Sequence, residues 1–294
     1  MSAPGHFGAY GFRIVPSDER LALPGLVPVP ADAERVSVTW ESGPVEEDVI
    51  DVTPARARLS VKGMVAIALT ETDPELHIRV PGALQPEAVV HPILTTPLAI
   101  LARWRGRAAL HAGAVLHEGA AVAVCGQQGA GKSTAMASLA ARGLPVVTDD
   151  LVVLEHGDVL SGPSCIDLRA DTAERFPRAE YLGVVGARER HRLMTAPAPA
   201  RVPLAGIFLL EWATEDDDEP LRAEPLALPE RIALIHAYDY AGLVGLPRGE
   251  ALLDLVELPM WRLVRPRDWA AGDAALDLLL SVAAASRPAA TPPA

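Results

Sequence analysis

The distribution of apolar and polar positions divides the chain into two parts. Between residues 1 and 95, short apolar runs alternate with polar residues and are interrupted by proline and glycine, as is typical of strands. Val36, Val38 and Trp40 alternate with polar neighbours, which indicates a strand with one buried face. The predicted strands are 10–15, 35–40, 59–69 and 76–80. This part is therefore predicted to be a small β-rich N-terminal domain.

From residue 96 to 285 the apolar runs are longer and some have helical spacing, which predicts an α/β domain. The expected elements are helices at 97–105, 229–236 and 270–285, β-hairpins at 110–124 and 151–160, and a buried strand at 202–211. Because hairpins replace some of the βαβ crossovers of a doubly wound fold, we expect a mixed sheet.

The clearest motif in the chain lies between a predicted strand and a predicted helix. Residues 126–133 read Gly-Gln-Gln-Gly-Ala-Gly-Lys-Ser and fit the P-loop pattern G-x-x-x-x-G-K-[ST]. Gly143 and Pro145 end the alanine-rich helix that follows, so the context argues against an accidental match. Glycines let backbone N–H groups converge on phosphate oxygens at a helix N-terminus. The motif predicts nucleotide binding by Gly126, Gln127, Gln128, Gly129, Ala130, Gly131, Lys132, Ser133 and Thr134.

Two side chains of this motif have predicted chemical roles. Lys132 would reach the β- and γ-phosphates, and the Ser133 hydroxyl would ligate Mg²⁺. Lys132 is one of two lysines in the chain, the other being Lys62, so a lysine here is not compositional background. ATP and Mg²⁺ are therefore the expected cofactors.

A pair of acidic residues follows the next predicted strand. Val146–Thr148 is a short apolar strand, and Asp149 and Asp150 come directly after it. In α/β sheets the groups that face a ligand lie at the carboxyl ends of strands, so we expect the pair to share a crevice with the P-loop. Carboxylates at that position suit metal binding and base catalysis. A solvated loop that happens to contain two aspartates is the alternative.

Charge and composition narrow the class of partner. The 294 residues include 26 basic and 38 acidic side chains, for a net charge of −12. This balance argues against nonspecific binding to nucleic acid or to an anionic membrane. Cys125 and Cys165 have neither metal-ligand nor disulfide-framework spacing. The first residues lack a signal-peptide pattern and no apolar run reaches about 18 residues, so a cytoplasmic protein is expected.

Other polar segments are less specific. His77 and His91 have no partner at metal spacing and are interpreted as surface or hydrogen-bonded core histidines. Segment 188–201 could close over phosphates or an acidic substrate, or it could be a solvated loop. Its basic residues are Arg188, Arg190, His191, Arg192 and Arg201. The acidic run 215–219 is interpreted as a solvated loop and residues 286–294 as a disordered tail.

These motifs together resemble the catalytic domain of HPr kinase/phosphorylase and its smaller relatives. The segments that carry the resemblance are His111–Val115, Gly126–Ser133, Leu144–Asp150, Val202–Ala205 and Leu258–Leu263. Tyr10–Ile14, with Leu23 and Pro24 after it, is similar to the start of HPr-kinase-like proteins found beside lasso-peptide and other modified-peptide genes. The resemblance covers most of the chain and is strongest from 108 to 170. It implies a P-loop kinase core of the HPr kinase type after the β-rich N-terminal domain.

The resemblance also implies roles for the residues around the phosphates. Lys132 would stabilise the charge of the transferred phosphoryl group, and Asp149 would accept the proton of an attacking hydroxyl. Asp150 would assist the Mg²⁺ held by Ser133, although which aspartate does which is open. His111 matches a family histidine near the phosphates, with an ordinary core histidine as the alternative.

One further family segment is altered in this chain. Asp167 and Arg169 lie where HPr kinases carry Leu-Glu-Ile-Arg-Gly, and residues 166–170 here read Ile-Asp-Leu-Arg-Ala. The resemblance implies a catalytic role for Arg169 and a contact of Asp167 with the metal through a shorter side chain. The altered segment favours a relative with another substrate over HPr kinase proper.

The resulting hypothesis is an ATP-dependent kinase that phosphorylates a Ser or Thr hydroxyl of a peptide or protein. A ribosomally made precursor peptide, as in lasso-peptide tailoring, is the favoured acceptor. The alternatives are HPr kinase/phosphorylase proper, a small-molecule kinase and a nucleotide-binding regulator without transfer activity. Homo-oligomerisation is left open, and residues 1–95 are expected to help bind the acceptor.

Overall fold

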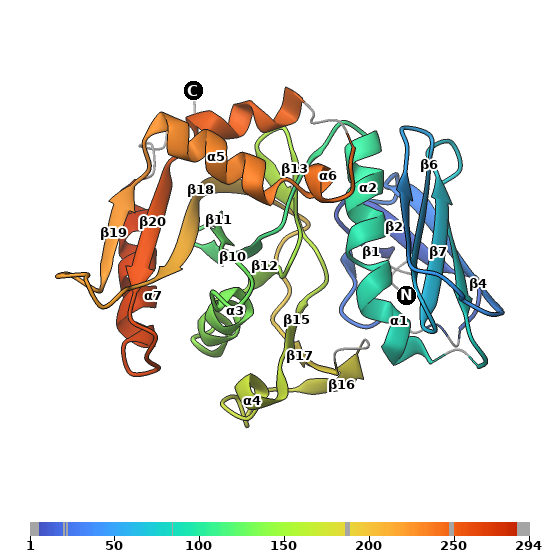
Figure 1. Ribbon diagram of the computed structural model, residues 1–294, viewed down its shortest axis with the longest axis horizontal. Coiled ribbons are helices and arrows are strands. Elements are labelled where there is room, and N and C mark those ends of the chain that lie inside the picture. The colour runs from blue at the N-terminus through green and yellow to red at the C-terminus, as the bar shows by residue number, and fades with distance from the viewer. Residues whose placement is uncertain are drawn as a thin grey trace.

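The computed structural model describes residues 6–286 apart from 20, 22, 84, 186–188 and 247–249. Arg188 and all of the expected tail except Ser286 therefore lie outside the described residues. The described chain is a mixed α/β protein with three β-sheets and helices packed on them (Figure 1). In this part of the chain, no helix is long and apolar enough to cross a membrane.

The first sheet has eight strands in the order β3-β1-β2-β4-β8-β7-β6-β5. The strands are β1 (Phe7–Ala9), β2 (Phe12–Pro16), β3 (Val27–Pro28), β4 (Glu34–Ser42), β5 (Val49–Val52), β6 (Arg56–Val61), β7 (Val65–Thr70) and β8 (Glu75–Val80). β4 pairs in parallel with β2 and β8, and the other neighbours are antiparallel. The predicted strands 35–40 and 76–80 correspond to β4 and β8.

Two predicted strands of this part have different limits in the structure. The strand expected at 59–69 is a hairpin, because Gly63 adopts a φ of 72° and turns the chain between β6 and β7. The strand expected from residue 10 begins at Phe12. Tyr10 and Gly11 have φ values of 55° and 77° and form the turn after β1. Positive φ values interrupt a strand, and the apolar pattern alone does not reveal them.

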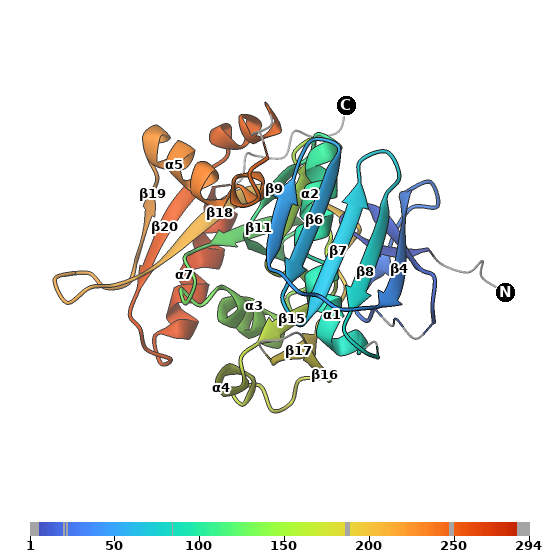
Figure 2. The same cartoon turned by 45° about the vertical axis from the view of Figure 1, so that its right-hand side comes forward.

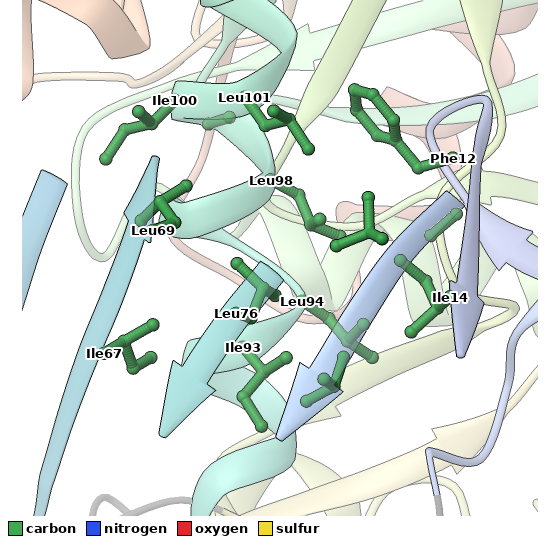
Figure 3. Close-up of a cluster of buried hydrophobic side chains, with 14 of the residues drawn as sticks. Phe12, Ile14, Ile67, Leu69, Leu76, Ile93, Leu94, Leu98, Ile100 and Leu101 are labelled. Carbon is green, nitrogen blue, oxygen red and sulfur yellow. The ribbon is translucent and has the colours of Figure 1, made fainter. Parts of the chain in front are cut away.

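Helices α1 (Pro86–Ile93) and α2 (Thr96–Trp104) cover one face of the first sheet (Figure 2). Leu98 and Leu101 of α2 are fully buried in the cluster between these helices and the strands (Figure 3). The same cluster contains Ala109, Val153 and Leu160, which belong to the second sheet. The apolar core is therefore continuous past residue 95, and the division of the chain into domains at 95/96 stays a prediction.

The second sheet has nine strands, with the order β12-β10-β11-β18-β14-β13-β9, β20 beside β18, and β19 beside β20. The strands are β9 (Ala108–Leu110), β10 (Gly113–His117), β11 (Ala120–Cys125), β12 (Val146–Thr148), β13 (Val152–Glu155), β14 (Asp158–Leu160), β18 (Arg201–Trp212), β19 (Arg222–Pro225) and β20 (Met260–Arg265). β18 is parallel to β11 and β20 but antiparallel to β14. The prediction of a mixed sheet is thus confirmed.

Both faces of β11 are buried, as its uninterrupted apolar run predicts. Val122 and Val124 face the helices α3 (Lys132–Ala141) and α7 (Gly272–Ala285), whereas Ala121 and Ala123 face α5 (Leu228–Tyr238). Both predicted hairpins also form, although the first begins at Gly113, because Leu110 belongs to β9 and pairs with β13. Their turns have positive φ values at Glu118–Gly119 and at His156–Gly157.

A third, three-stranded sheet has the order β15-β17-β16 and lies below the second sheet in Figure 1. The remaining elements are β15 (Cys165–Leu168), α4 (Ala170–Ala173), β16 (Tyr181–Val185), β17 (Arg190–Met194), α6 (Tyr240–Leu243) and two 3-10 turns, Glu250–Leu252 and Asp254–Glu257. The interpretation of 188–201 as one loop is wrong over 190–194, because β17 pairs with both β15 and β16.

Candidate functional site

The loop between β11 and α3, residues 126–131, is held in a tight conformation that requires glycine. Gly129 and Gly131 have φ values of 85° and 82°, which strain any residue with a Cβ. At Gly126 an added Cβ would lie 2.9 Å from the Ala130 Cβ. Lys132 is buried, and its Nζ donates to the Gly126 carbonyl oxygen at 2.7 Å. The lysine ammonium is therefore folded over the loop, and its predicted contact with phosphates stays a prediction.

The acidic pair lies in a turn at the end of β12. The buried Thr148 hydroxyl donates to the Leu151 carbonyl oxygen at 2.7 Å, and the Leu151 N–H donates to the Asp149 carbonyl oxygen at 2.8 Å. Asp150 adopts a φ of 65°, a left-handed conformation that aspartate tolerates better than most residues. These bonds fix the direction in which both carboxylates leave the strand.

The Asp149 carboxylate is buried beside two other acidic side chains. Burial raises the pKa of Asp149 well above its ordinary value, and the negative charges of Asp150 and Asp167 raise it further. Its Oδ2 accepts a 3.3 Å hydrogen bond from the Asp167 N–H, whereas its buried Oδ1 has no hydrogen-bond partner among the described residues. The nearby Ser133 side chain offsets the pKa shift in part. The hydroxyl of the P-loop serine and the carboxylate of Asp149 are therefore neighbours.

Asp167 is bound on both of its oxygens. Arg192 donates from Nε to Oδ1 at 2.8 Å and from Nη2 to Oδ2 at 2.7 Å, and the His91 Nδ1 lies 2.7 Å from Oδ2. Burial alone would raise the pKa of Asp167, but the hydrogen bonds from Arg192 and His91 outweigh it and lower the pKa to about 2. Asp167 is thus an ionised partner of two basic side chains, and its expected contact with a metal stays a prediction.

The sequence interpretation of His91 as a hydrogen-bonded histidine agrees with this contact, but the partner was not foreseen. His91 belongs to α1 and Asp167 to β15, so a helix that follows the N-terminal sheet reaches the candidate site. Tyr10 does the same from the β1–β2 turn. It is fully buried, and its hydroxyl oxygen lies 3.4 Å from the Thr148 hydroxyl beside the acidic pair.

His111 lies between the acidic pair and the lysine. Its Nδ1 is 3.0 Å from the Asp150 carbonyl oxygen, which can only accept, so the proton is on Nδ1. Burial and the nearby Lys132 charge lower the pKa of His111. The ring also meets Tyr240 edge-on with centroids 6.0 Å apart. His111 is therefore a neutral imidazole that braces the backbone of Asp150.

A large cleft of about 960 Å³ brings most of the predicted residues together. Predicted site residues that line it are His111, Gln127, Gln128, Gly129, Gly131, Lys132, Ser133, Thr134, Asp150, Asp167 and Arg169. Asp149 lines a smaller adjoining cavity of about 20 Å³ together with Asp150 and Asp167. Gly126 and Ala130 are buried beneath the loop surface.

The basic residues of segment 190–201 have separate environments. Arg190 lines the cleft, Arg192 is paired with Asp167, and Arg201 is paired with Glu155 and Asp158 at the start of β18. Of these described arginines, only Arg190 is placed to meet a ligand in the cleft. Of the two alternatives for this segment, closure over phosphates or an acidic substrate is therefore not supported for Arg192 and Arg201, which pair with the protein's own carboxylates.

In the described part of the chain, no group of three or more His, Cys, Asp and Glu side chains is arranged to hold a metal ion. Mg²⁺ bound with a nucleotide commonly uses only one or two protein oxygens in addition to phosphate and water. Ser133 and the partnerless Oδ1 of Asp149 are a donor set of that kind. The residues present therefore fit a magnesium ion held jointly with phosphates.

Two site residues could not be found from the sequence. Trp212 and Arg265 both contact the 126–131 loop, although they are far from it in the chain. Their only signal is that Trp212 lies just past the predicted strand 202–211 and Arg265 just past 258–263, a segment of the family resemblance. The register of three strands, described below, brings them to the loop.

Among the comparisons with known proteins, only the one with solved structures gives matches. No family model matches the chain, and no curated protein matches it. A solved structure with a similar arrangement is the HPr(Ser) kinase/phosphatase from Coxiella burnetii, at 11% sequence identity and a TM-score of 0.31. The match covers 59% of this chain and 95% of that chain. Because identity and TM-score are low, nothing about function is transferred from this likeness.

Proposed function

We propose that this protein is an ATP-dependent kinase that transfers the γ-phosphoryl group to a Ser or Thr hydroxyl of a peptide or protein. The observation that carries the proposal is the meeting of Lys132, Ser133 and the Asp149–Asp150 pair beside one cleft. Phosphoryl transfer needs positioning, charge neutralisation and a base, and these four side chains supply that set.

The loop 126–131 and Lys132 would bind the phosphates of ATP. Ser133 and Asp149 would hold Mg²⁺, which supplies positive charge to the phosphate oxygens when it is bound. The raised pKa of Asp149 and its partnerless Oδ1 support this role, because a cation relieves the repulsion among three neighbouring carboxylates. Asp167 is not assigned to the metal, because Arg192 and His91 occupy its oxygens.

We assign the base to Asp150. It lines the large cleft, whereas Asp149 lines the smaller adjoining cavity and lies near Ser133. This placement favours the reverse of the division of roles that the resemblance implies. In the transfer, the acceptor hydroxyl oxygen bonds to the γ-phosphorus and the bond from that phosphorus to the β–γ bridging oxygen breaks. ADP leaves with the electron pair, and the hydroxyl proton passes to the Asp150 carboxylate. His111 holds the Asp150 backbone during this step.

The acceptor is proposed to be a ribosomally made precursor peptide. The support is the resemblance of Tyr10–Ile14 to the start of HPr-kinase-like proteins beside modified-peptide genes. A cleft of about 960 Å³ has room for a nucleotide together with part of a peptide. Val61, Met64 and Val65, around the β6–β7 turn, form its wall on the side of the N-terminal sheet.

The test is transfer of label from γ-labelled ATP to candidate peptides, to HPr and to small hydroxyl metabolites, followed by intact-mass measurement. Asp150→Asn should keep ATP affinity and lower the transfer rate by about 100-fold or more, the usual contribution of a general base. Asparagine tolerates the left-handed conformation at this position, so the fold is preserved. Lys132→Ala should lose both binding and transfer.

Transfer by Asp150→Asn at the wild-type rate would overturn the base assignment. Binding of ATP by the wild-type protein without any phosphorylated product would show a nucleotide-binding regulator instead of a kinase. If only HPr or only a metabolite became labelled, that molecule would be the acceptor and the proposed peptide acceptor would be wrong.

A further inference from the structure

Three parallel strands end at the edge of the second sheet where the 126–131 loop begins. β11 leads into the loop, and β18 and β20 lie beside it in that order (Figure 1). Cys125, the last residue of β11, is opposite Leu209, so β18 continues past the end of β11 and alongside the loop. Trp212 and Arg265, the last residues of β18 and β20, are register partners. An aromatic side chain and a basic side chain are therefore delivered together to the loop.

Both side chains contact loop carbonyl groups. The Trp212 Nε1 donates to the Gly129 carbonyl oxygen at 3.1 Å, and the Arg265 Nη2 donates to the Ala130 carbonyl oxygen. The guanidinium carbon of Arg265 lies 3.9 Å from the centroid of the Trp212 ring, a close cation–π contact. A Cβ at Gly131 would lie only 3.0 Å from the Arg265 Nη2. The loop, the tryptophan and the arginine thus pack as one unit at the cleft.

Arg265 has no negative partner in the described part of the chain, and its buried Nε lacks a hydrogen bond. Burial lowers the pKa of Arg265 to about 10, and no acidic group counteracts it. Arg262, on the same strand, shows the usual arrangement and pairs with Glu211, Glu224 and Glu230. A desolvated cation without a counter-charge is costly. Its presence beside a phosphate-binding motif indicates that the counter-charge comes from a ligand.

We infer that Arg265, braced by Trp212, is a phosphate-binding residue that pairs with the polyphosphate of the nucleotide in the 126–131 loop. When the polyphosphate binds, the guanidinium exchanges the Ala130 carbonyl for a phosphate oxygen. Arginine suits this role because its planar donors match phosphate geometry. The inference rests on the proposed function only in taking the ligand to be a nucleotide.

The test measures affinity of the full chain for MgATP, magnesium tripolyphosphate and adenosine by titration calorimetry. Arg265→Met should weaken binding of ATP and of tripolyphosphate about tenfold or more, the loss expected for one charge-assisted contact, and should leave adenosine binding unchanged. The affinities of Arg265→Lys for ATP and tripolyphosphate should lie between those of the wild type and of Arg265→Met. Arg262→Met is the matched control and should leave all three affinities unchanged, because its partners are the protein's own carboxylates.

Two readouts separate ligand binding from a structural role. The ligand-free melting temperature of Arg265→Met should equal or exceed that of the wild type, since an unpaired buried charge is removed. Tripolyphosphate should change the tryptophan fluorescence of the wild type more than that of Trp212→Phe, because the guanidinium over the Trp212 ring shifts when it exchanges the Ala130 carbonyl for a phosphate oxygen. A structural role would instead lower the ligand-free melting temperature and leave tripolyphosphate affinity intact.

Wild-type affinity for tripolyphosphate in Arg265→Met would overturn the inference. If Arg265→Met does not fold, wild-type affinity of Arg265→Lys for tripolyphosphate would overturn the inference instead. The proposed kinase function can fail separately: weakened polyphosphate binding without any transfer product supports the inference and contradicts the kinase. No binding of ATP or tripolyphosphate by the wild type would contradict both.

Discussion

At the scale of single residues, the site contains two neighbouring carboxylates whose pKa values are shifted in opposite directions by their environments. Asp149 is buried among acidic groups, and its pKa is raised. Asp167 is held by Arg192 and His91, and its pKa is lowered to about 2. The ionised form of an aspartate is therefore destabilised at position 149 and stabilised at position 167, and a perturbed carboxylate such as Asp149 is the kind of group that functional sites contain.

These shifts predict opposite effects of two matched substitutions on the free energy of unfolding. The folded pKa of Asp149 is raised, so its stability contribution is present at low pH and is lost as pH rises through that pKa. Asp149→Asn mimics the protonated form and should stabilise the ligand-free protein at neutral pH by about 1 kcal/mol or more. The gain should vanish as the pH falls below the ordinary value of 3.8, where Asp149 is protonated in the unfolded chain as well. Urea unfolding at neutral pH and at about pH 3 measures it.

Asp167→Asn should lower the free energy of unfolding at neutral pH, in contrast to Asp149→Asn. Its folded pKa is lowered, so its contribution is present above the unfolded value of 3.8 and is lost as pH falls toward about 2. At neutral pH the substitution should cost about 2 to 4 kcal/mol, because it also leaves the buried Arg192 without its partner. If both variants changed stability in the same direction, the assignment of the two environments would be wrong.

At the scale of elements, the candidate loop depends on the strands beside it as much as on its own glycines. Gly129 and Gly131 have nearly the same positive φ, but only Gly131 faces Arg265 and Trp212. An added Cβ at Gly129 would meet nothing within 4 Å. The sequence motif has glycine at both positions, but it does not show that Gly129 is needed only for its backbone conformation and Gly131 for its side-chain neighbours as well.

This difference predicts unequal effects of two alanine substitutions. Gly129→Ala should cost about 1 kcal/mol from the left-handed backbone alone. Gly131→Ala should cost more, about 2 kcal/mol, and should weaken ATP binding further because the Arg265–Trp212 contact must shift. Chemical denaturation and ATP titration measure both.

Gly157→Ala serves as the control for this pair. Gly157 has a φ of 83° in a turn away from the site, with nothing within 4 Å of an added Cβ. It should lose stability like Gly129→Ala but bind ATP as the wild type does. Equal ATP affinities of Gly131→Ala and Gly129→Ala would contradict the packing explanation.

At the scale of the whole molecule, the N-terminal sheet and the rest of the chain share one core. α2 is buried against the first sheet through Leu98, Ile100 and Leu101, and the cluster extends into the second sheet. Tyr10 and His91 line the small cavity that Asp149, Asp150 and Asp167 also line. Residues before 96 therefore support the site directly as well as forming one wall of the cleft.

A fragment of residues 96–294 tests this dependence. It should be insoluble or lack a cooperative unfolding transition, because the fully buried side chains of α2 would be exposed to water. Production together with residues 1–95 should restore a soluble complex. Circular dichroism and thermal unfolding provide the measurement. A cooperative transition of the 96–294 fragment alone would instead support two independent domains, as the hydrophobic pattern predicts.

Much of the fold could be predicted because its signals are short in sequence. The hairpins around Glu118–Gly119 and His156–Gly157, α2, α5, α7 and β18 follow from apolar periodicity and turn residues. The errors occurred where one residue changes the backbone direction, as at Gly63, or where a polar run such as 190–194 pairs as a strand. The turn at Gly63 and the strand at 190–194 depend on backbone conformation and on pairing with other strands, which apolar periodicity does not reveal.

The sequence by itself determined the glycine-rich loop 126–131, the lysine and serine after it, and the acidic pair that follows the next strand. Each of these is local, because backbone dihedral preferences and strand–loop–helix order act over a few residues. Only the tertiary structure decided that Asp167 is neutralised by Arg192 and His91, and that Arg265 meets the loop without a counter-charge. The physical reason is that strand register and packing set the distances between residues that are remote in the chain, and electrostatic energies depend on those distances and on burial.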